Sequence, residues 1–437
     1  MKVSIIALGY VGLTNAIVLA ERGFDVLAYD KDPEKVAQLQ KGEPTIDEPG
    51  FKEALYKYRK RLHFTSVETD IYNGVSIFFV AVDTPAKEDG QSDLTHLNEA
   101  VDSILNNAVG EAFVVIRSTV PVGTNKRLSE TKTTVKGEKV HFIANPEFLA
   151  EGQALLDERQ PSRIVIGSSE RSVRDLLRKI YAKPIYNGVP YYEMDGASAE
   201  FTKYASNIFL AMKISYINEL SRLAEPLGAD IGAVALATGA DPRIGHSMLK
   251  AGVGYGGACL PKDGSALLAS AKAAGVRLSL VEDVNAINQS QPAYFYNKIK
   301  AKFGSLEKKN FAVLGLAFKA KTSDVRRSAA SFFVESLLKD GAVVSAYDPS
   351  IKAREGFKGL LGARDNLSIV SSVNEAVKGA DAILILTEGQ EFAALDENEL
   401  IKVMKGRMIF DGRNLYSVNH FRYFDYISIG RAEHKHE

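Results

Sequence analysis

The sequence predicts an α/β protein with two doubly wound, Rossmann-like domains joined by a long central helix and a helical middle domain. From residue 1 to about residue 192, short β-branched runs alternate with amphipathic stretches. Such runs, separated by helices, are typical of a parallel sheet that is buried on both faces. The alternation starts again at Asn310, and both halves contain a strand that ends in Ala-Tyr-Asp, at residues 28–30 and 346–348. Two β-α-β units of the same design therefore open two separate sheets.

The elements follow from local patterns along the chain. Strands are expected at 3–7, 26–30, 77–82, 114–117, 142–144 and 164–166, with helices at 11–22 and 33–40. Between 195 and 227, apolar residues recur every three or four positions, which predicts one long helix with an early break near Gly196. A glycine-rich segment follows at 251–257, and then more helix to about Phe303. The predicted domains are residues 1–193, 194–303 and 304–437.

Composition narrows the class of protein. Among 437 residues, Lys and Arg number 54 and Asp and Glu number 54, so the formal net charge is zero. That balance gives no electrostatic reason to expect nucleic acid or an anionic membrane as the main partner. A single cysteine excludes an internal disulfide framework and a cysteine-based zinc site, and no metal is expected. With no leader pattern and no apolar run of about 20 residues, we expect a soluble, cytoplasmic protein.

The first turn of the chain carries a dinucleotide fingerprint. Residues 7–12 read Ala-Leu-Gly-Tyr-Val-Gly after the first strand, with alanine in place of the first glycine. Gly9 would let the backbone approach a pyrophosphate, and Gly12 would let the helix pack on the strand. Asp30 ends the second strand, where a carboxylate binds the ribose hydroxyls of NAD and repels the 2′-phosphate of NADP. Lys35 lies close enough to weaken that discrimination. The alternative is a purely structural turn.

The corresponding turn of the second half lacks this fingerprint. It reads Gly-Leu-Ala-Phe-Lys-Ala at residues 315–320. Basic side chains gather near the strand end, where open α/β sheets bind ligands. They are Lys319, Lys321, Arg326 and Arg327. The pattern fits either a phosphate-bearing ligand or a solvated basic turn.

The stretch around the only cysteine is the least ordinary of the chain. Four glycines between residues 252 and 257 allow the close approach that ligand-wrapping loops use. Cys259 follows, with Lys262 and Asp263 just beyond it. If a helix starts near Pro261, its dipole would favour the nucleophilic thiolate. The alternative is a buried, inert thiol.

Further polar residues occupy places where a ligand could reach them. Lys203 and Asn207 are four residues apart on the predicted long helix and so share one face. Thr119 and Glu147 each follow a predicted strand, at the edge where cofactor and substrate would meet. Each could equally be a solvated polar residue, but together they converge on one edge of the first sheet.

Motifs along nearly the whole chain resemble the NAD-dependent UDP-glucose/GDP-mannose dehydrogenase family. They lie at residues 9–12, 117–121, 145–152, 203–207, 241–245, 254–263, 315–319 and 411–414. The resemblance implies that the C6 alcohol of a nucleotide sugar is oxidised to a carboxylate in two hydride transfers to NAD. It also implies a homodimer built on the long helix.

The resemblance implies roles for individual residues. Cys259 is similar to the nucleophile that forms a thiohemiacetal and then a thioester, and Glu147 to the acid/base group for hydrolysis. The implied catalytic residues are Cys259, Lys203, Asn207, Asp263, Glu147 and Thr119. The implied NAD contacts are Gly9, Tyr10, Val11, Gly12, Asp30, Lys35, Thr84, Thr119, Glu151 and Arg326. The implied sugar-nucleotide contacts are Glu147, Phe148, Leu149, Glu151, Lys203, Asn207, Arg243 of a neighbouring subunit, Lys250, Tyr255, Gly256, Phe318, Lys319 and Arg413.

One position bears on the sugar and the base. Leu260 follows the cysteine where members that act on UDP-glucose usually carry Phe, and leucine there also resembles GDP-mannose dehydrogenases. Residues 241–245 and Tyr255 favour UDP-glucose. A silent NAD and nucleotide-sugar binding regulator is a third possibility, which the joint presence of Cys259, Lys203 and Asp263 argues against.

Overall fold

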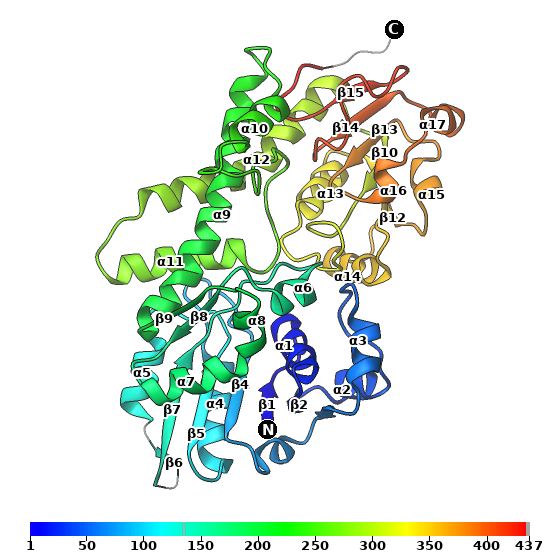
Figure 1. Cartoon of the computed structure of the whole chain (residues 1–437). Coiled ribbons are helices and arrows are strands. Elements are labelled where there is room, and N and C mark those ends of the chain that lie inside the picture. The colour runs from blue at the N-terminus through cyan, green and yellow to red at the C-terminus, as the bar shows by residue number, and fades with distance from the viewer. Residues whose placement is uncertain (133, 136, 434–437) are drawn as a thin grey trace. The chain divides into compact units, whose positions relative to one another are not determined.

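The computed structural model describes residues 1–132, 134–135 and 137–433 (Figure 1). Its contacts divide the chain into two compact units. The first unit consists of Met1–Ser206 with Ser265–Val276, and the second of Asn207–Gly264 with Arg277–Glu437. Within the described ranges, every helix is too short or too polar to cross a membrane.

The first unit contains a largely parallel sheet in the order β3-β2-β1-β4-β5-β7-β8-β9, with β6 paired to β7. The strands are β1 (Lys2–Ile6), β2 (Asp25–Tyr29), β3 (Leu62–Thr65), β4 (Ile77–Val80), β5 (Ala112–Ile116), β6 (Thr134–Val135), β7 (Glu138–Ala144), β8 (Ile164–Gly167) and β9 (Tyr191–Met194). Only β7–β8 and β6–β7 pair antiparallel among the strands described. The strand order reverses direction at β1, which is where doubly wound sheets bind their ligands.

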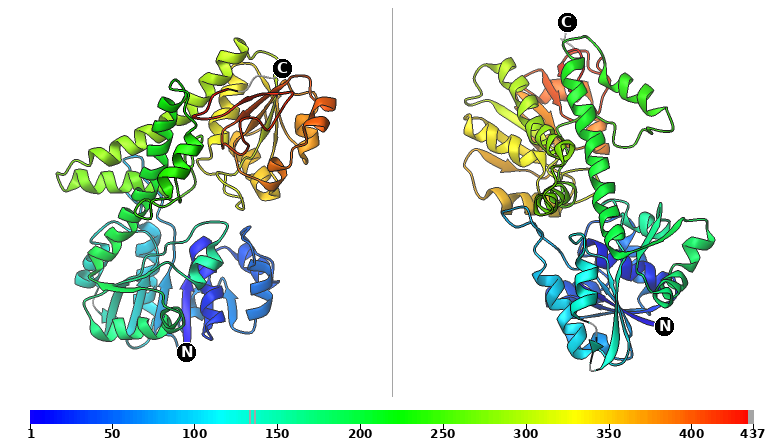
Figure 2. Two further views of the ribbon diagram at one scale, coloured as in Figure 1. Left: turned by 45° about the horizontal axis from the view of Figure 1, so that its top comes forward. Right: turned by 90° about the vertical axis from the view of Figure 1, so that its left-hand side faces the viewer.

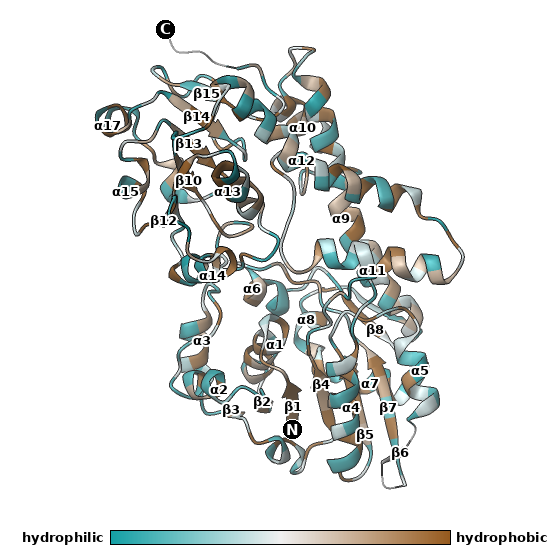
Figure 3. Ribbon diagram, turned by 180° about the vertical axis from the view of Figure 1, so that it is seen from behind, coloured by the Kyte–Doolittle hydropathy of each residue, from teal (hydrophilic) through white to brown (hydrophobic). Residues whose placement is uncertain are grey.

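Helices cover both faces of this sheet (Figure 1). They are α1 (Tyr10–Glu21), α2 (Pro33–Gln40), α3 (Phe51–Tyr58), η1 (Glu68–Tyr72), α4 (Thr95–Asn107), α5 (Thr124–Thr131), α6 (Ala154–Arg159), α7 (Arg171–Ile180) and α8 (Ala182–Tyr186). In β4, Phe79 packs into one apolar cluster and Phe78 into the other. Burial on both faces explains the uninterrupted apolar sequence of this strand, which is brown in Figure 3.

The predicted long helix is α9 (Gly196–Ala224), which can be followed in Figure 2. It begins at the glycine where a break was expected. A Cβ on Gly196 would lie 2.6 Å from the Asn125 Oδ1 atom, so the helix start leaves no room for a side chain. Asp195 accepts a hydrogen bond from the Ser198 N–H at 2.8 Å and caps the helix.

The helices that follow are α10 (Ile231–Gly239), α11 (Leu260–Ala273) and α12 (Ser279–Phe303). The helical stretch predicted to run to about Phe303 consists of two helices, α11 and α12. Gly275 adopts a φ of +71° after α11, and the Val276 N–H bonds back to the Ala271 carbonyl at 2.9 Å. This left-handed glycine turn ends the helix.

The second unit contains a six-stranded sheet that is parallel throughout, in the order β12-β11-β10-β13-β14-β15. Its strands are β10 (Asn310–Leu314), β11 (Val343–Tyr347), β12 (Leu367–Ile369), β13 (Ala382–Ile385), β14 (Met408–Asp411) and β15 (Asp425–Ile427). Its helices are α13 (Ala329–Lys339), α14 (Ile351–Leu361), α15 (Val373–Val377), α16 (Gln390–Ala393) and α17 (Glu397–Val403). The predicted fold class, with two doubly wound sheets and long helices in the chain between them, is confirmed.

Candidate active site

The turn between β1 and α1 has the geometry of a dinucleotide site. Ala7 adopts a φ of +73°, a left-handed conformation that alanine disfavours and glycine accepts. A Cβ on Gly12 would lie 1.9 Å from the Ala7 carbonyl oxygen, so glycine is required there for helix and strand to pack. A Cβ on Gly9 would meet nothing within 4 Å, so this glycine leaves space for a ligand. The turn fits the pyrophosphate of NAD.

Asp30, the acidic residue predicted to bind the ribose, is buried beside this turn. Its side chain is 7% exposed, and it accepts hydrogen bonds from the Leu8 N–H at 2.8 Å and the Asp32 N–H at 3.1 Å. The Lys35 ammonium donates to the same carboxylate at 2.9 Å. The carboxylate stands at the end of β2, where the ribose hydroxyls of NAD are expected, and the paired lysine partly neutralises it.

The segment around Glu151 is held by two residues from the start of the chain. The Tyr10 hydroxyl accepts a hydrogen bond from the Gly152 N–H at 2.6 Å. Glu48, which is 8% exposed, accepts from the Gly152 and Ala154 N–H groups at 2.7 and 2.6 Å. Sequence reasoning missed Glu48, because no local pattern links it to a segment about a hundred residues away.

Thr84 and Thr119 are in direct contact. The Thr84 hydroxyl donates to the Thr119 carbonyl oxygen at 2.7 Å. Thr119 lies just beyond β5, so two of the predicted cofactor contacts form one hydrogen-bonded pair at the edge of the first sheet.

Glu147 and Lys203 form a buried ion pair. The Lys203 ammonium donates to Glu147 Oε1 at 2.8 Å, and the side chains are 4% and 7% exposed respectively. The Leu149 N–H donates to Glu147 Oε2 at 2.6 Å. Burial by itself would raise the pKa of Glu147, but Lys203, this N–H and the charge of Arg117 together lower the pKa below its usual value. Glu147 is therefore a carboxylate at neutral pH.

In the second unit, Cys259 immediately precedes α11, as the sequence predicted. The Asp263 N–H donates to the Cys259 carbonyl at 2.9 Å and closes the first helical turn. The cysteine is exposed. Its location at a helix start favours a thiolate, and the alternative of a buried thiol is wrong.

Asp263 is paired rather than free. It is 1% exposed, and its Oδ2 accepts from the Asn207 side-chain amide at 2.6 Å. Its Oδ1 lies 2.8 Å from the Lys262 ammonium. One turn of helix thus separates an exposed thiol from a buried carboxylate that an amide orients.

The glycine-rich segment before Cys259 is held by side-chain amides. Gly252 donates its N–H to Asn218 at 2.8 Å and accepts from Gln291 at 3.0 Å. The Asn288 amide binds both main-chain groups of Tyr255, at 2.8 and 3.0 Å. These amides satisfy backbone groups that no strand partner pairs, so the loop has one defined conformation.

Two glycines of this segment contact the turn after β10. A Cβ on Gly256 would lie 2.1 Å from the Arg327 carbonyl oxygen, and one on Gly257 would lie 2.9 Å from the Phe318 ring. The Gly257 N–H also donates to the Arg326 carbonyl at 3.0 Å. The spacing of these glycines is therefore set by close packing between two loops.

Arg413 ties three loops of the second unit together. Its guanidinium donates to the carbonyl oxygens of Leu386 at 2.6 Å, Gly254 at 3.2 Å and Phe318 at 3.1 Å. Two of these loops carry predicted sugar-nucleotide contacts. The arginine thus orders these loops, while its predicted contact with the sugar nucleotide stays a prediction.

Two further predicted contacts, Lys250 and Arg243, each lie close to a carboxylate. Lys250 lies 3.8 Å from Glu388, a carboxylate that the sequence did not single out. Burial alone would raise the pKa of Glu388, but the charges of Arg413 and Lys250 lower it. The Arg243 side chain is 88% exposed and pairs with Asp241 at 2.6 Å.

The predicted residues fall into two groups, one in each compact unit. The first unit contains Gly9, Tyr10, Val11, Gly12, Asp30, Lys35, Thr84, Thr119, Glu147, Phe148, Leu149, Glu151 and Lys203. The second contains Asn207, Arg243, Lys250, Tyr255, Gly256, Cys259, Asp263, Phe318, Lys319, Arg326 and Arg413. Within the part of the chain that the structure describes, no cluster of His, Cys, Asp and Glu is arranged for a metal ion.

Comparisons with known proteins agree with these features. Three family descriptions match in order: the NAD binding domain over residues 1–185, the central domain over 197–290 and the UDP binding domain over 312–418. A UDP-glucose 6-dehydrogenase of Rhizobium meliloti is 39% identical over 99% of this chain and 100% of its own length.

Solved structures agree as well. A UDP-glucose dehydrogenase from Pyrobaculum islandicum has a TM-score of 0.89 at 34% identity, over 98% of this chain and 96% of that one. A UDP-D-ManNAc dehydrogenase from Pyrococcus horikoshii has a TM-score of 0.86 at 28% identity, over 99% of both chains. The fold and the matched domains define an NAD-dependent nucleotide-sugar dehydrogenase. The chain belongs to the UDP-glucose/GDP-mannose dehydrogenase family.

Proposed function

We propose that the protein oxidises UDP-glucose to UDP-glucuronate in two NAD-dependent steps that pass through a covalent intermediate on Cys259. The observation that carries the proposal is the exposed thiol at the start of α11, one helical turn from the buried Asp263–Asn207 pair. A thiolate at a helix N-terminus is an activated nucleophile. A covalent intermediate would also keep the aldehyde from leaving between the two oxidations.

With NAD bound, the residues of this chain can support both oxidations. NAD supplies the hydride acceptor for each oxidation, so one sugar consumes two NAD. After the C6 alcohol has lost a hydride and its hydroxyl proton has passed to water, the Cys259 thiolate bonds to the aldehyde carbon. Lys203 and Asn207 stabilise the resulting oxyanion, because a cationic amine and an amide N–H are suited to that charge. Loss of the second hydride leaves a thioester.

Glu147 is suited to the hydrolysis that ends the cycle. As a carboxylate at neutral pH, it can accept a proton from the attacking water. The carbon–sulfur bond then breaks, Cys259 leaves as a thiolate and the sugar is released as a carboxylate. Thr119 is assigned to ordering the water, and Asp263 to supporting Asn207.

A test of the covalent step uses Cys259→Ser. We expect this variant to stop after the first oxidation, with uronate formation at least about 100-fold slower, because a hydroxyl is a far weaker nucleophile than a thiolate. NAD and UDP-glucose should bind nearly as in the wild type. In Glu147→Gln, by contrast, mass spectrometry of the acid-quenched Cys259 peptide should find a sugar thioester. Normal uronate production by Cys259→Ser would remove the thiol from the mechanism.

GDP-mannose is the second candidate substrate, and Leu260 is the observation that favours it. The sugar and base are tested by comparing kcat/KM for both nucleotide sugars in the wild type and in Leu260→Phe. If the protein acts on UDP-glucose despite Leu260, UDP-glucose is preferred by the wild type and by the variant. A wild-type preference for GDP-mannose would transfer the proposal to that substrate and keep the mechanism.

We also propose that the working unit is a homodimer. On α9, Phe209, Tyr216 and Leu223 are 58%, 50% and 56% exposed at a spacing of seven residues, which makes one exposed apolar stripe in the second unit. The exposed Arg243 would then contact substrate bound by the other subunit.

Subunit mixing tests this assignment. Arg243→Ala should raise the KM for the sugar, and Cys259→Ala should be inactive. Refolded together in equal amounts, the two variants should regain about a quarter of wild-type activity at low sugar, because half of the dimers are mixed and each has one complete site. Activity equal to the average of the separate variants would contradict the cross-subunit role.

A further inference from the structure

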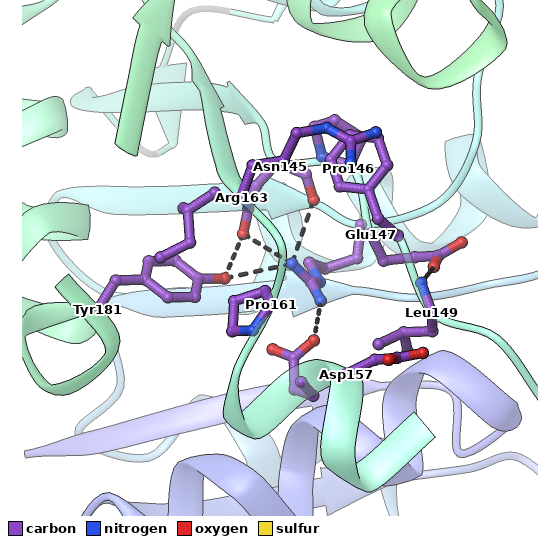
Figure 4. A pocket seen from close by; sticks show the side chains of 12 residues that line it. Asn145, Pro146, Glu147, Leu149, Asp157, Pro161, Arg163 and Tyr181 are labelled. Carbon is purple, nitrogen blue, oxygen red and sulfur yellow. Dashed lines mark hydrogen bonds and ion pairs between the residues drawn. The ribbon is translucent and has the colours of Figure 1, made fainter. Parts of the chain in front are cut away.

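Behind Glu147, the first unit contains a buried arginine for which the family resemblance gave no role. Arg117 follows β5 and is 3% exposed. Its guanidinium donates to Glu158 at 2.7 Å, to the Asn145 side chain at 3.1 Å and to the Tyr181 hydroxyl at 3.2 Å. These residues and Glu147 line one small cavity (Figure 4).

Glu158 connects this arginine to α1, the helix that follows the predicted pyrophosphate turn. Its second carboxylate oxygen accepts from the Asn15 amide of α1 at 3.0 Å. Arg22, at the end of α1, donates to the Glu158 main-chain carbonyl at 2.8 Å. The guanidinium is thus fixed by a carboxylate that is itself held by α1.

Arg117 acts on Glu147 in two ways. It holds Asn145, which lies two residues before Glu147 and also donates to the Val165 carbonyl at 3.0 Å. In addition, its positive charge lowers the pKa of Glu147, by less than Lys203 and the Leu149 N–H do and against the opposing effect of burial.

The charged and titratable groups around Glu147 can be named from each neighbouring element. Lys203 of α9 pairs with it directly. The other groups that line the cavity are Arg117, Asp157, Glu158, Arg163 and Tyr181. Arg163 stacks on the Phe148 ring at 3.7 Å, while Asp157 accepts from the Ala150 N–H at 2.8 Å. Among these groups, Lys203 and Arg117 are the two cations whose charges lower the pKa of Glu147.

We infer that Arg117, fixed by Glu158, is a positioning residue that orients Glu147 for the hydrolytic step. This inference rests on the proposed role of Glu147. Stability alone gives a weak reason for the arrangement, because replacing a buried ion pair by uncharged groups is often neutral or stabilising. The arginine does not touch the reacting atoms in this proposal.

The test removes both charges of the pair together, so that no unpaired charge is left buried. The variant is Arg117→Met with Glu158→Gln, in which the glutamine oxygen can still accept from Asn15. Arg117→Lys is a second variant that keeps the positive charge but loses the forked geometry. The control is Arg178→Met with Glu193→Gln, which removes a more exposed Arg–Glu contact of 2.8 Å elsewhere in the same unit.

The readout is the rate of thioester hydrolysis as a function of pH, with NAD affinity measured alongside. In the Arg117/Glu158 variant we expect a fall of about 10-fold or more, because a misaligned general base loses much of its contribution. The acidic limb of the profile should move to higher pH, since loss of a nearby cation raises the pKa of Glu147. In Arg117→Lys, hydrolysis should also be slower than in the wild type, but the acidic limb should shift less than in the Arg117/Glu158 variant. The NAD affinity of the Arg117/Glu158 variant and the hydrolysis rate of the control variant should both stay within about two-fold of wild type.

A hydrolysis rate and acidic limb equal to those of the control, whatever the change in melting temperature, would overturn the positioning role. Failure of the proposed function itself would give a different result. In that case the wild type would release no second NADH, or Glu147→Gln would hydrolyse the intermediate at the normal rate.

Discussion

The two β-α-β units of this protein share a topology but not a ligand geometry. In the first, only residues 7–9 separate β1 from α1, so the helix N-terminus lies directly at the strand end. In the second, residues 315–328 separate β10 from α13 and pack against Gly256 and Gly257. Both units have an aspartate at the end of the second strand. Asp30 accepts a hydrogen bond from the Leu8 N–H, and Asp348 accepts one from the Leu316 N–H, both at 2.8 Å.

Connection length, rather than strand order, is therefore the feature that distinguishes the two halves. A helix N-terminus can hold a pyrophosphate only when it lies close to the strand end. The aspartates differ accordingly. Asp30 is shared between main-chain groups and Lys35, whereas Asp348 is committed to the N–H groups of Leu316, Ala317 and Ser350 at 2.8 to 3.0 Å.

The largest expected effect is at the glycine that allows the first helix to start so early. Gly12→Ala would place a Cβ 1.9 Å from a carbonyl oxygen, so we expect a loss of about 3 kcal/mol or more in unfolding free energy and no detectable NAD binding. Gly9→Ala is the matched control, because that Cβ has open space. It should cost about 1 kcal/mol or less while still weakening NAD binding. Equal stability of the two variants in urea unfolding would contradict the described turn.

The aspartates provide the next contrast. Asp348→Asn should cost about 1 to 3 kcal/mol, because a buried acceptor of three N–H groups is impaired, and should leave NAD affinity unchanged. Asp30→Asn should instead weaken NAD binding by about 10-fold and narrow the preference over NADP. Urea unfolding and titration calorimetry separate the two effects. A normal NAD affinity in Asp30→Asn would remove this carboxylate from the cofactor site.

The smallest effect is expected at Ala7, the first position of the first turn. Ala7 and Gly315 both have positive φ values, +73° and +96°. Ala7→Gly should therefore stabilise the protein by up to about 1 kcal/mol through relief of backbone strain. In the opposite direction, Gly315→Ala should destabilise it by more, because its Cβ would lie 2.4 Å from the Thr387 Cβ. If Ala7→Gly lowers the melting temperature, the alanine is not strained in solution.

Local patterns explain what the sequence could predict. The cofactor turn, both Ala-Tyr-Asp strands and the helix start at Cys259 depend on neighbours within a few residues, where periodicity and glycine spacing are informative. The supports of the site depend on pairs far apart in the chain. Glu48 holds residues 152 and 154, and Asn288 holds Tyr255. Polar residues of this kind show no pattern that tells a buried bond from a solvated surface.

Arg117 illustrates the same limit within a quoted motif. Its position was visible in residues 117–121, but its partners Glu158 and Tyr181 lie 41 and 64 residues further along the chain. Only the folded sheet brings them together behind Glu147. The outlines of the fold were therefore predictable, while the electrostatics of the candidate site required the structure.

The measurement that tests the account most directly is the number of NADH molecules formed per molecule of sugar. The assay uses limiting UDP-glucose with excess NAD, and GDP-mannose in a parallel reaction. The account predicts two NADH per UDP-glucose, with UDP-glucuronate as the product and no free aldehyde. One NADH per sugar with release of the aldehyde would contradict the coupled, cysteine-linked oxidation.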